Sequence, residues 1–102
     1  LKEISSGERQ RVFLARAIFQ NPKLILLDEP TNHLDPKASN NFWKSVILAR
    51  QRKSLDVLLS THDLSFVEKE CDWVLALNRG ELFFSGPKSE FFESKLSECL
   101  FL

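Results

Sequence analysis

Residues 24–30 read LILLDEP, a short apolar run that ends in two carboxylates and a proline. A continuous apolar run of this length is typical of a strand that is buried on both faces of a parallel sheet. We therefore expect a strand over 24–27, with Asp28 and Glu29 at its carboxyl end. In open α/β sheets, this end of the strands borders the ligand crevice.

The residues around this strand predict an alternation of helices and strands. Apolar residues recur at helical spacing before Asn21-Pro22, and Asp35-Pro36 fits the N-cap and first position of a second helix. The predicted elements are a helix over 8–20, the strand over 24–27, a helix over 36–53, a strand over 55–60 and a short helix over 63–71. This order predicts the α/β fold class with a mostly parallel sheet.

The last third of the chain predicts a hairpin followed by a helix. Strands over 73–77 and 81–84 flank Asn78-Arg79-Gly80, a three-residue turn with glycine where a left-handed conformation is needed. Gly86-Pro87 then begins the last helix.

Length, composition and charge limit the classes of protein to which the chain can belong. The 102 residues carry 14 basic and 14 acidic side chains and are 43% apolar, which predicts one small globular domain and excludes a multi-domain chain. No apolar run approaches the roughly 20 residues of a membrane helix.

Residues 1–53 carry a net charge of +5 and residues 54–102 one of −5, which permits an anionic ligand near the first half. Cys71 and Cys99 lack the spacing of a zinc site or disulfide scaffold, so we expect a reducing cytosol.

Two groups of residues could carry chemistry. Ser5 and Gly7 directly precede or open the first helix, where free N–H groups and the helix dipole favour a phosphate. The alternative is a capping box, for which Ser5 and Glu8 have the required spacing, and the two interpretations can coexist.

The second group lies at the ends of the two predicted parallel strands. Of the adjacent carboxylates Asp28 and Glu29, one could hold Mg²⁺ while the other orients a nucleophile, and His62 would share this sheet edge. The structural alternatives are a helix cap or solvated turn for the carboxylates and a hydrogen-bonded turn for the histidine.

Four ordered motifs together resemble the ABC-type ATPase domain. They are ISSGERQR at 4–11, LILLDEP at 24–30, TNHLD at 31–35 and STHD at 60–63, similar to the family's signature motif, Walker B strand, D-loop and H-loop. The resemblance covers almost the whole chain. It implies the C-terminal part of a three-layer P-loop NTPase fold, with a signature helix over 1–20 and a portion of the RecA-like core over 23–102.

The resemblance also implies ATP and Mg²⁺ as ligands and a role for each motif. It implies that Asp28 holds Mg²⁺ through water, that Glu29 polarises the attacking water and that His62 contacts the γ-phosphate. The nucleotide-binding residues that it implies outside Walker B are Ser5, Gly7, Glu8 and Asp35. In the family the signature serine and glycine, here Ser5 and Gly7, reach the γ-phosphate of ATP held by the opposite subunit, and the D-loop Asp35 lines the same dimer interface. The resemblance therefore implies that hydrolysis belongs to a dimer.

The chain departs from the family pattern in two ways. Ser6 stands where the family normally has a glycine, and no G-x-x-x-x-G-K-[ST] motif is present, so the Walker A half of the domain is missing. In the family's sheet order, the missing Walker A strand lies between the strands predicted over 55–60 and 73–77, so we expect a gap in the sheet. We also expect that the 102 residues alone neither bind ATP tightly nor hydrolyse it. Opening on Leu1 rather than methionine fits a fragment.

Within the family, the signature and H-loop segments most resemble the ATPase subunit of a membrane transporter. This implies transmembrane permease partners, a peripheral location on the cytoplasmic face of the membrane and no nucleic-acid partner. Three alternatives remain: a soluble ABC-F-type ATPase acting on ribosomes, a DNA-repair ATPase of the SMC type, and a non-catalytic remnant. The TNHLD segment favours the first alternative and the absent P-loop lysine favours the last.

Overall fold

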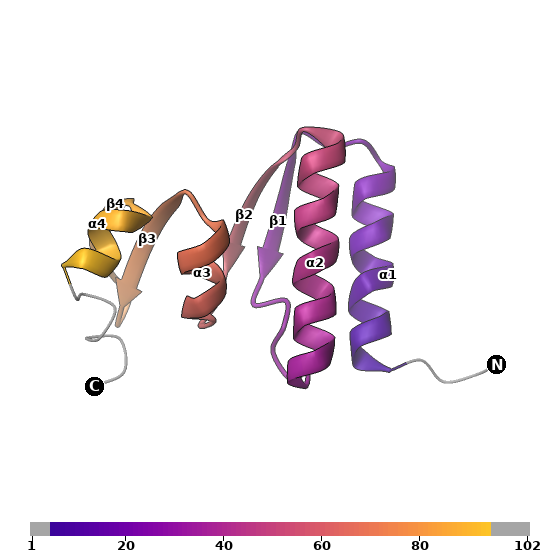
Figure 1. Cartoon of the computed structure of the whole chain (residues 1–102), viewed down its shortest axis with the longest axis horizontal. Coiled ribbons are helices and arrows are strands. Elements are labelled where there is room, and N and C mark those ends of the chain that lie inside the picture. The colour runs from indigo at the N-terminus through magenta and orange to yellow at the C-terminus, as the bar shows by residue number, and fades with distance from the viewer. Residues whose placement is uncertain (1–4, 95–102) are drawn as a thin grey trace. The chain divides into compact units, whose positions relative to one another are not determined.

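The computed structural model describes residues 5–94, and Ile4 of the signature motif and Cys99 lie outside this range. In chain order the elements are α1 (Ser6–Phe19), β1 (Leu24–Asp28), α2 (Pro36–Lys53), β2 (Asp56–Ser60), α3 (Leu64–Glu70), β3 (Trp73–Asn78), β4 (Glu81–Pro87) and α4 (Lys88–Glu93) (Figure 1). Every predicted element is present, with small shifts at the ends. The α/β fold class is confirmed.

The chain divides into two compact units, Leu1–His62 and Asp63–Leu102. β1 and β2 form a parallel sheet in the first unit, and β3 and β4 form an antiparallel sheet in the second. The single domain expected from composition is therefore divided in two. β2 and β3 lie in different sheets, and the gap expected for a Walker A strand between them stays a prediction.

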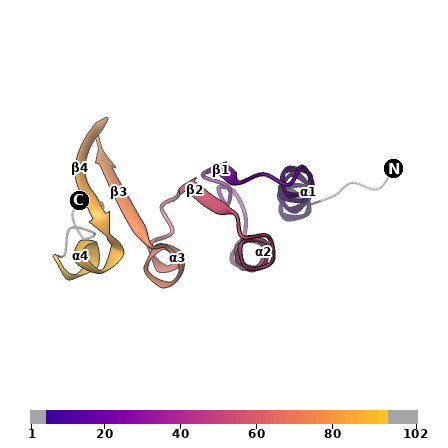
Figure 2. The ribbon, with the colours of Figure 1, turned by 90° about the horizontal axis from the view of Figure 1, so that it is seen from above.

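The first unit is a β-α-β arrangement with one additional helix. Asp35 caps α2, and Ser54 ends the helix in a left-handed conformation. α1 lies alongside α2, and Figure 2 shows both helices end-on. The amino ends of both helices lie at the same end as the carboxyl ends of β1 and β2 (Figure 1). This end of the first unit therefore holds Ser5 and Gly7, the Asp28-Glu29 pair, the TNHLD segment and His62.

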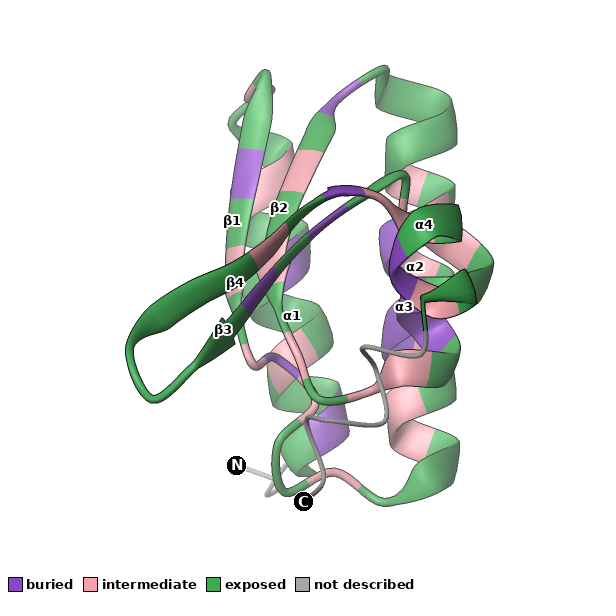
Figure 3. Ribbon diagram, turned by 90° about the vertical axis from the view of Figure 1, so that its left-hand side faces the viewer, coloured by how far each residue is buried: buried purple, intermediate pink, exposed green. Residues whose placement is uncertain are grey.

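Large apolar side chains from α2 dominate the core of the first unit. The buried apolar residues are Leu14, Ile25, Phe42, Trp43, Val46 and Leu55 (Figure 3). The rings of Phe42 and Trp43 meet edge to face at a centroid distance of 5.4 Å, a favourable arrangement for aromatic pairs. Burying each such side chain contributes about 1.5–3 kcal/mol. The core therefore draws on α1, β1, α2 and the residue before β2.

The parallel sheet is covered on only one of its faces. Ile25 is 5% exposed, whereas Leu24, Leu26 and Leu58 are 51%, 68% and 55% exposed. Because side chains alternate along a strand and the strands are in register, these three leucines share the opposite face. The prediction of a strand buried on both faces is wrong for the described part of this unit, since none of its helices covers that face.

The second unit packs a hairpin against α4. Val67, Val74, Ala76 and Phe91 form its core. The strands pair up to Asn78 opposite Glu81, so the turn has two residues rather than the three predicted. Arg79 and Gly80 both have positive φ, 50° and 78°, as in the type I′ turns that match the twist of a hairpin. The left-handed glycine is confirmed.

Candidate functional site

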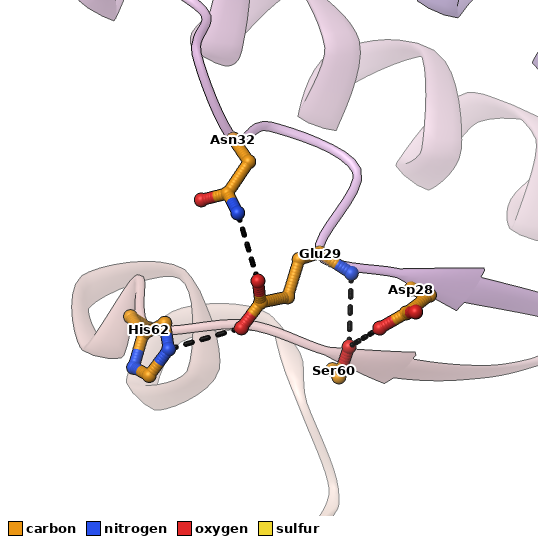
Figure 4. A network of polar contacts seen from close by, with 5 residues as sticks. All are labelled: Asp28, Glu29, Asn32, Ser60 and His62. Atoms are coloured by element: carbon orange, nitrogen blue, oxygen red, sulfur yellow. Dashed lines mark hydrogen bonds and ion pairs between the residues drawn. The ribbon is translucent and has the colours of Figure 1, made fainter.

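Polar side chains meet where β1 and β2 end. The parallel register places Asp28 opposite Ser60, and the Ser60 hydroxyl donates to Oδ1 of Asp28 at 2.7 Å. The same hydroxyl accepts a hydrogen bond from the Glu29 amide at 2.9 Å (Figure 4). One serine therefore contacts both residues of the carboxylate pair.

The Glu29 carboxylate is held at both of its oxygens. Nε2 of His62 lies 3.0 Å from Oε1, and Nδ2 of Asn32 donates to Oε2 at 2.8 Å (Figure 4). The side chains of His62 and Glu29 are 83% and 36% exposed. The structure thus brings Asp28, Glu29 and His62 together at the carboxyl ends of β1 and β2. The side chains of Glu29 and His62 are exposed enough for a ligand to reach them.

Two residues of this network were not among the predicted site residues. Ser60 follows an apolar run just as Asp28 does, and pairing these two runs in register would have indicated their contact. Asn32 is brought to Glu29 by the turn after β1, where Glu29 and His33 have positive φ values of 41° and 67°. No sequence pattern signals that conformation, because glycine rather than glutamate is the usual left-handed residue.

The four residues assigned to nucleotide binding line one hollow at the amino ends of α1 and α2. The hollow measures about 290 Å³ and is lined by Ser5, Gly7, Glu8, Arg11, Asp35, Lys37, Ala38 and Asn41. Two helix dipoles and two cationic side chains favour an anion there, whereas the two carboxylates oppose it. Asp28, Glu29 and His62 are not among the lining residues.

Each of these four residues also has a local structural role. The Ser5 hydroxyl accepts from the Glu8 amide at 3.1 Å, which is the N-cap half of the predicted capping box, and donates to the Glu8 carboxylate at 3.2 Å. Asp35 accepts from the Ala38 amide at 2.7 Å. Gly7 is buried, and a Cβ atom there would lie 2.8 Å from Cβ of Ala38. Glycine at this position therefore permits close packing of the two helices.

A side-chain hydrogen bond links α1 to the end of β1. The Gln10 amide donates to the carbonyl oxygen of Pro30, the residue after the carboxylate pair. The helix that carries the signature residues is thereby tied to the segment that follows Glu29.

Asp28 offers a suitable oxygen for a divalent cation. Its Oδ1 accepts from Ser60, which leaves Oδ2 for a ligand. Within residues 5–94, no group of three or more His, Cys, Asp or Glu side chains could hold a metal ion. Mg²⁺ in phosphate-transferring sites is commonly bound by one or two carboxylates together with substrate phosphates. The single free carboxylate oxygen of Asp28 therefore suits a magnesium ion that takes most of its ligands from water or phosphate.

Comparison with known proteins shows clear relatives. A profile of the family described as ABC transporter matches residues 1–32. The phosphonates import ATP-binding protein PhnC 1 of Synechococcus sp. (strain JA-2-3B'a(2-13)) is 40% identical over 98 residues, which cover 96% of this chain and 37% of that protein. The methionine import ATP-binding protein MetN of Sodalis glossinidius (strain morsitans) is 39% identical over 89 residues, covering 87% of this chain and 26% of that protein.

The fold agrees with these sequence matches. MJ1267, an ATP-binding cassette of an ABC transporter, superposes with a TM-score of 0.81 at 21% identity, covering 98% of this chain and 41% of that chain. The chain thus spans well under half the length of each of these proteins. None of the helices within residues 5–94 has the length and apolar character needed to cross a membrane. The matched motifs, the relatives and the shared fold identify the chain as part of an ABC-type ATPase domain.

Proposed function

We propose that this chain is the C-terminal part of the nucleotide-binding domain of an ABC transporter subunit, which hydrolyses ATP to drive transport of a solute. Residues 1–20 would supply the signature helix and residues 23–102 a portion of the RecA-like core. The observation that carries the proposal is the meeting of Asp28, Glu29 and His62 at the carboxyl ends of two parallel strands. Relatives named as import ATP-binding proteins support it.

Glu29 and His62 would act on the nucleotide and the attacking water. Phosphoryl transfer depends on positioning and charge stabilisation more than on covalent chemistry. Asn32 and His62 set the orientation of the Glu29 carboxylate, which would orient and polarise the attacking water. The exposed His62 ring would contact the γ-phosphate.

Asp28 would hold Mg²⁺ through a bound water at Oδ2. Mg²⁺ supplies positive charge that neutralises the phosphate oxygens during transfer. The protein's part is to present one carboxylate oxygen in a fixed orientation, which the hydrogen bond from Ser60 at 2.7 Å supports.

The hollow at the amino ends of α1 and α2 would receive the ATP held by a second ABC ATPase domain. Arg11 and Lys37 add positive charge beside Ser5 and Gly7 in its lining. Asp28, Glu29 and His62 do not line this hollow, so the proposal has two separate phosphate positions, which two nucleotides shared in a dimer would occupy. Permease subunits would hold such a dimer at the cytoplasmic face of the membrane.

The proposal is tested by restoring the missing part of the domain. The segment of the Synechococcus relative that precedes the aligned region is fused ahead of Leu1, and Mg²⁺-dependent ATP hydrolysis is measured. We expect turnover that falls by at least about 100-fold in Glu29→Gln, because the attacking water loses its carboxylate. A folded fusion that does not hydrolyse ATP, or that does so equally well with Glu29→Gln, would contradict the proposal.

The chain without that segment provides the matched control. Because the sequence has no P-loop lysine, we expect neither tight ATP binding nor turnover from the 102 residues alone. Calorimetric titration with Mg-ATP and a phosphate-release assay measure both. Mg²⁺-dependent turnover from a clean preparation would show that the Walker A half is not needed, and inactivity of both proteins would favour a non-catalytic remnant.

A further inference from the structure

Ser60 lies between the two carboxylates and has a fixed direction of hydrogen bonding. Its hydroxyl carries one proton, and the Glu29 N–H at 2.9 Å can only donate to it. The hydroxyl proton is therefore left for Oδ1 of Asp28 at 2.7 Å, which is a short, charge-assisted hydrogen bond. This arrangement gives the carboxylate one held oxygen and one free oxygen.

The same serine supports an unfavourable backbone conformation. Glu29 has a φ of 41°, in the left-handed region that residues with a Cβ atom seldom adopt. Its N–H donates both to the Ser60 hydroxyl and, at 3.0 Å, to the Ser60 carbonyl oxygen. Two acceptors on one residue of β2 thus hold the backbone from which the Glu29 side chain extends toward His62.

We propose that Ser60 is a positioning residue for ATP hydrolysis, which orients Asp28 toward the metal ion and holds Glu29 in its left-handed conformation. The proposal rests on the proposed function. It assigns to the hydroxyl an effect on both the proposed metal-binding carboxylate and the carboxylate proposed to orient water, through its hydrogen bonds to Asp28 and to the Glu29 amide.

The matched pair Ser60→Thr and Ser60→Val tests this role. Threonine keeps the hydroxyl and valine has nearly the same shape without it, and the exposed side-chain position leaves room for either. In the fusion described above, we expect Ser60→Val to raise the KM for Mg²⁺ about tenfold and to lower kcat about tenfold, the scale of a lost hydrogen bond to a charged group. Ser60→Thr should remain within about twofold of the parent.

A second measurement does not depend on hydrolysis. In the 102-residue chain, hydrogen exchange of the Glu29 amide, followed by NMR, should be about fivefold faster in Ser60→Val than in Ser60→Thr, because one acceptor is lost. Equal exchange in the two variants, or equal KM and kcat, would overturn the proposed role of Ser60.

The two proposals can fail separately. A parent fusion whose turnover depends on Glu29, combined with identical Thr and Val variants, refutes only the role of Ser60. A folded parent fusion without Glu29-dependent turnover refutes the proposed function and with it the role of Ser60 in hydrolysis. Faster exchange in Ser60→Val then shows only that the hydroxyl holds the Glu29 backbone.

Discussion

Replacement of Gly7 by alanine tests whether this glycine serves helix packing. The added Cβ would lie 2.8 Å from Cβ of Ala38, about 0.7–1.2 Å closer than the roughly 3.5–4.0 Å at which carbon atoms pack favourably. A Cβ atom is attached directly to the backbone, so no side-chain rotation relieves the contact. One of the two helices has to move.

Two opposing effects set the size of the change. Overpacking of this kind typically lowers the free energy of unfolding by about 1–3 kcal/mol. Helix propensity alone would favour alanine over glycine by up to about 1 kcal/mol. Because Gly7 is buried where α1 lies against α2, we expect the steric effect to dominate and Gly7→Ala to lose about 1–2 kcal/mol.

Urea unfolding followed by the fluorescence of the buried Trp43 measures this change. The matched background is Ala38→Gly, which removes the methyl group that the new Cβ would meet. There Gly7→Ala should be neutral or stabilising by up to about 1 kcal/mol. Equal destabilisation by Gly7→Ala in both backgrounds would show that contact with Ala38 is not the reason for glycine.

Three further changes test local features of the fold. Asp35→Ala removes the acceptor for the Ala38 amide and should lower the free energy of unfolding in urea by about 1 kcal/mol, whereas Asp35→Ser should keep most of the stability. Equal free energies of unfolding for the two variants would contradict the capping role. Phe91→Ala removes a ring that is 1% exposed and should lower the free energy of unfolding of the second unit by about 3–5 kcal/mol. Trp73 fluorescence in a Trp43→Phe background measures this loss, and a loss below about 1 kcal/mol would refute the place of Phe91 in the core. Gly80→Ala should cost about 1–2 kcal/mol because φ is 78°, while Gly80→Asn should cost less in the same unfolding assay; equal costs would argue against the left-handed turn.

Much of the local structure follows from the sequence because its signals are local. The N-caps at Ser5 and Asp35, the Asn21-Pro22 stop and the left-handed Gly80 depend on neighbouring residues, and each is present in the structure. The predicted length of the hairpin turn was wrong, because one more pair, Asn78 with Glu81, changes a three-residue turn into one of two residues.

Burial was harder to predict than secondary structure. An apolar run shows that a strand can be buried on both faces, but the exposure of Leu26 depends on which elements pack on that face. The same holds for Phe13, which has helical spacing in the sequence and is 53% exposed in the structure. Periodicity indicates a side chain's direction, whereas burial requires a partner.

The sequence alone determined the order of the elements and the residue types at the strand ends, since hydrophobic pattern, caps and breakers act over a few residues. Only the tertiary structure decided how those residues combine. Ser60 meets Asp28 across 32 residues because two parallel strands pair in register, and Asn32 meets Glu29 because the backbone turns left-handed after β1. Gly7 likewise acquires its packing role only when α1 lies against Ala38 of α2, a contact that no local pattern encodes.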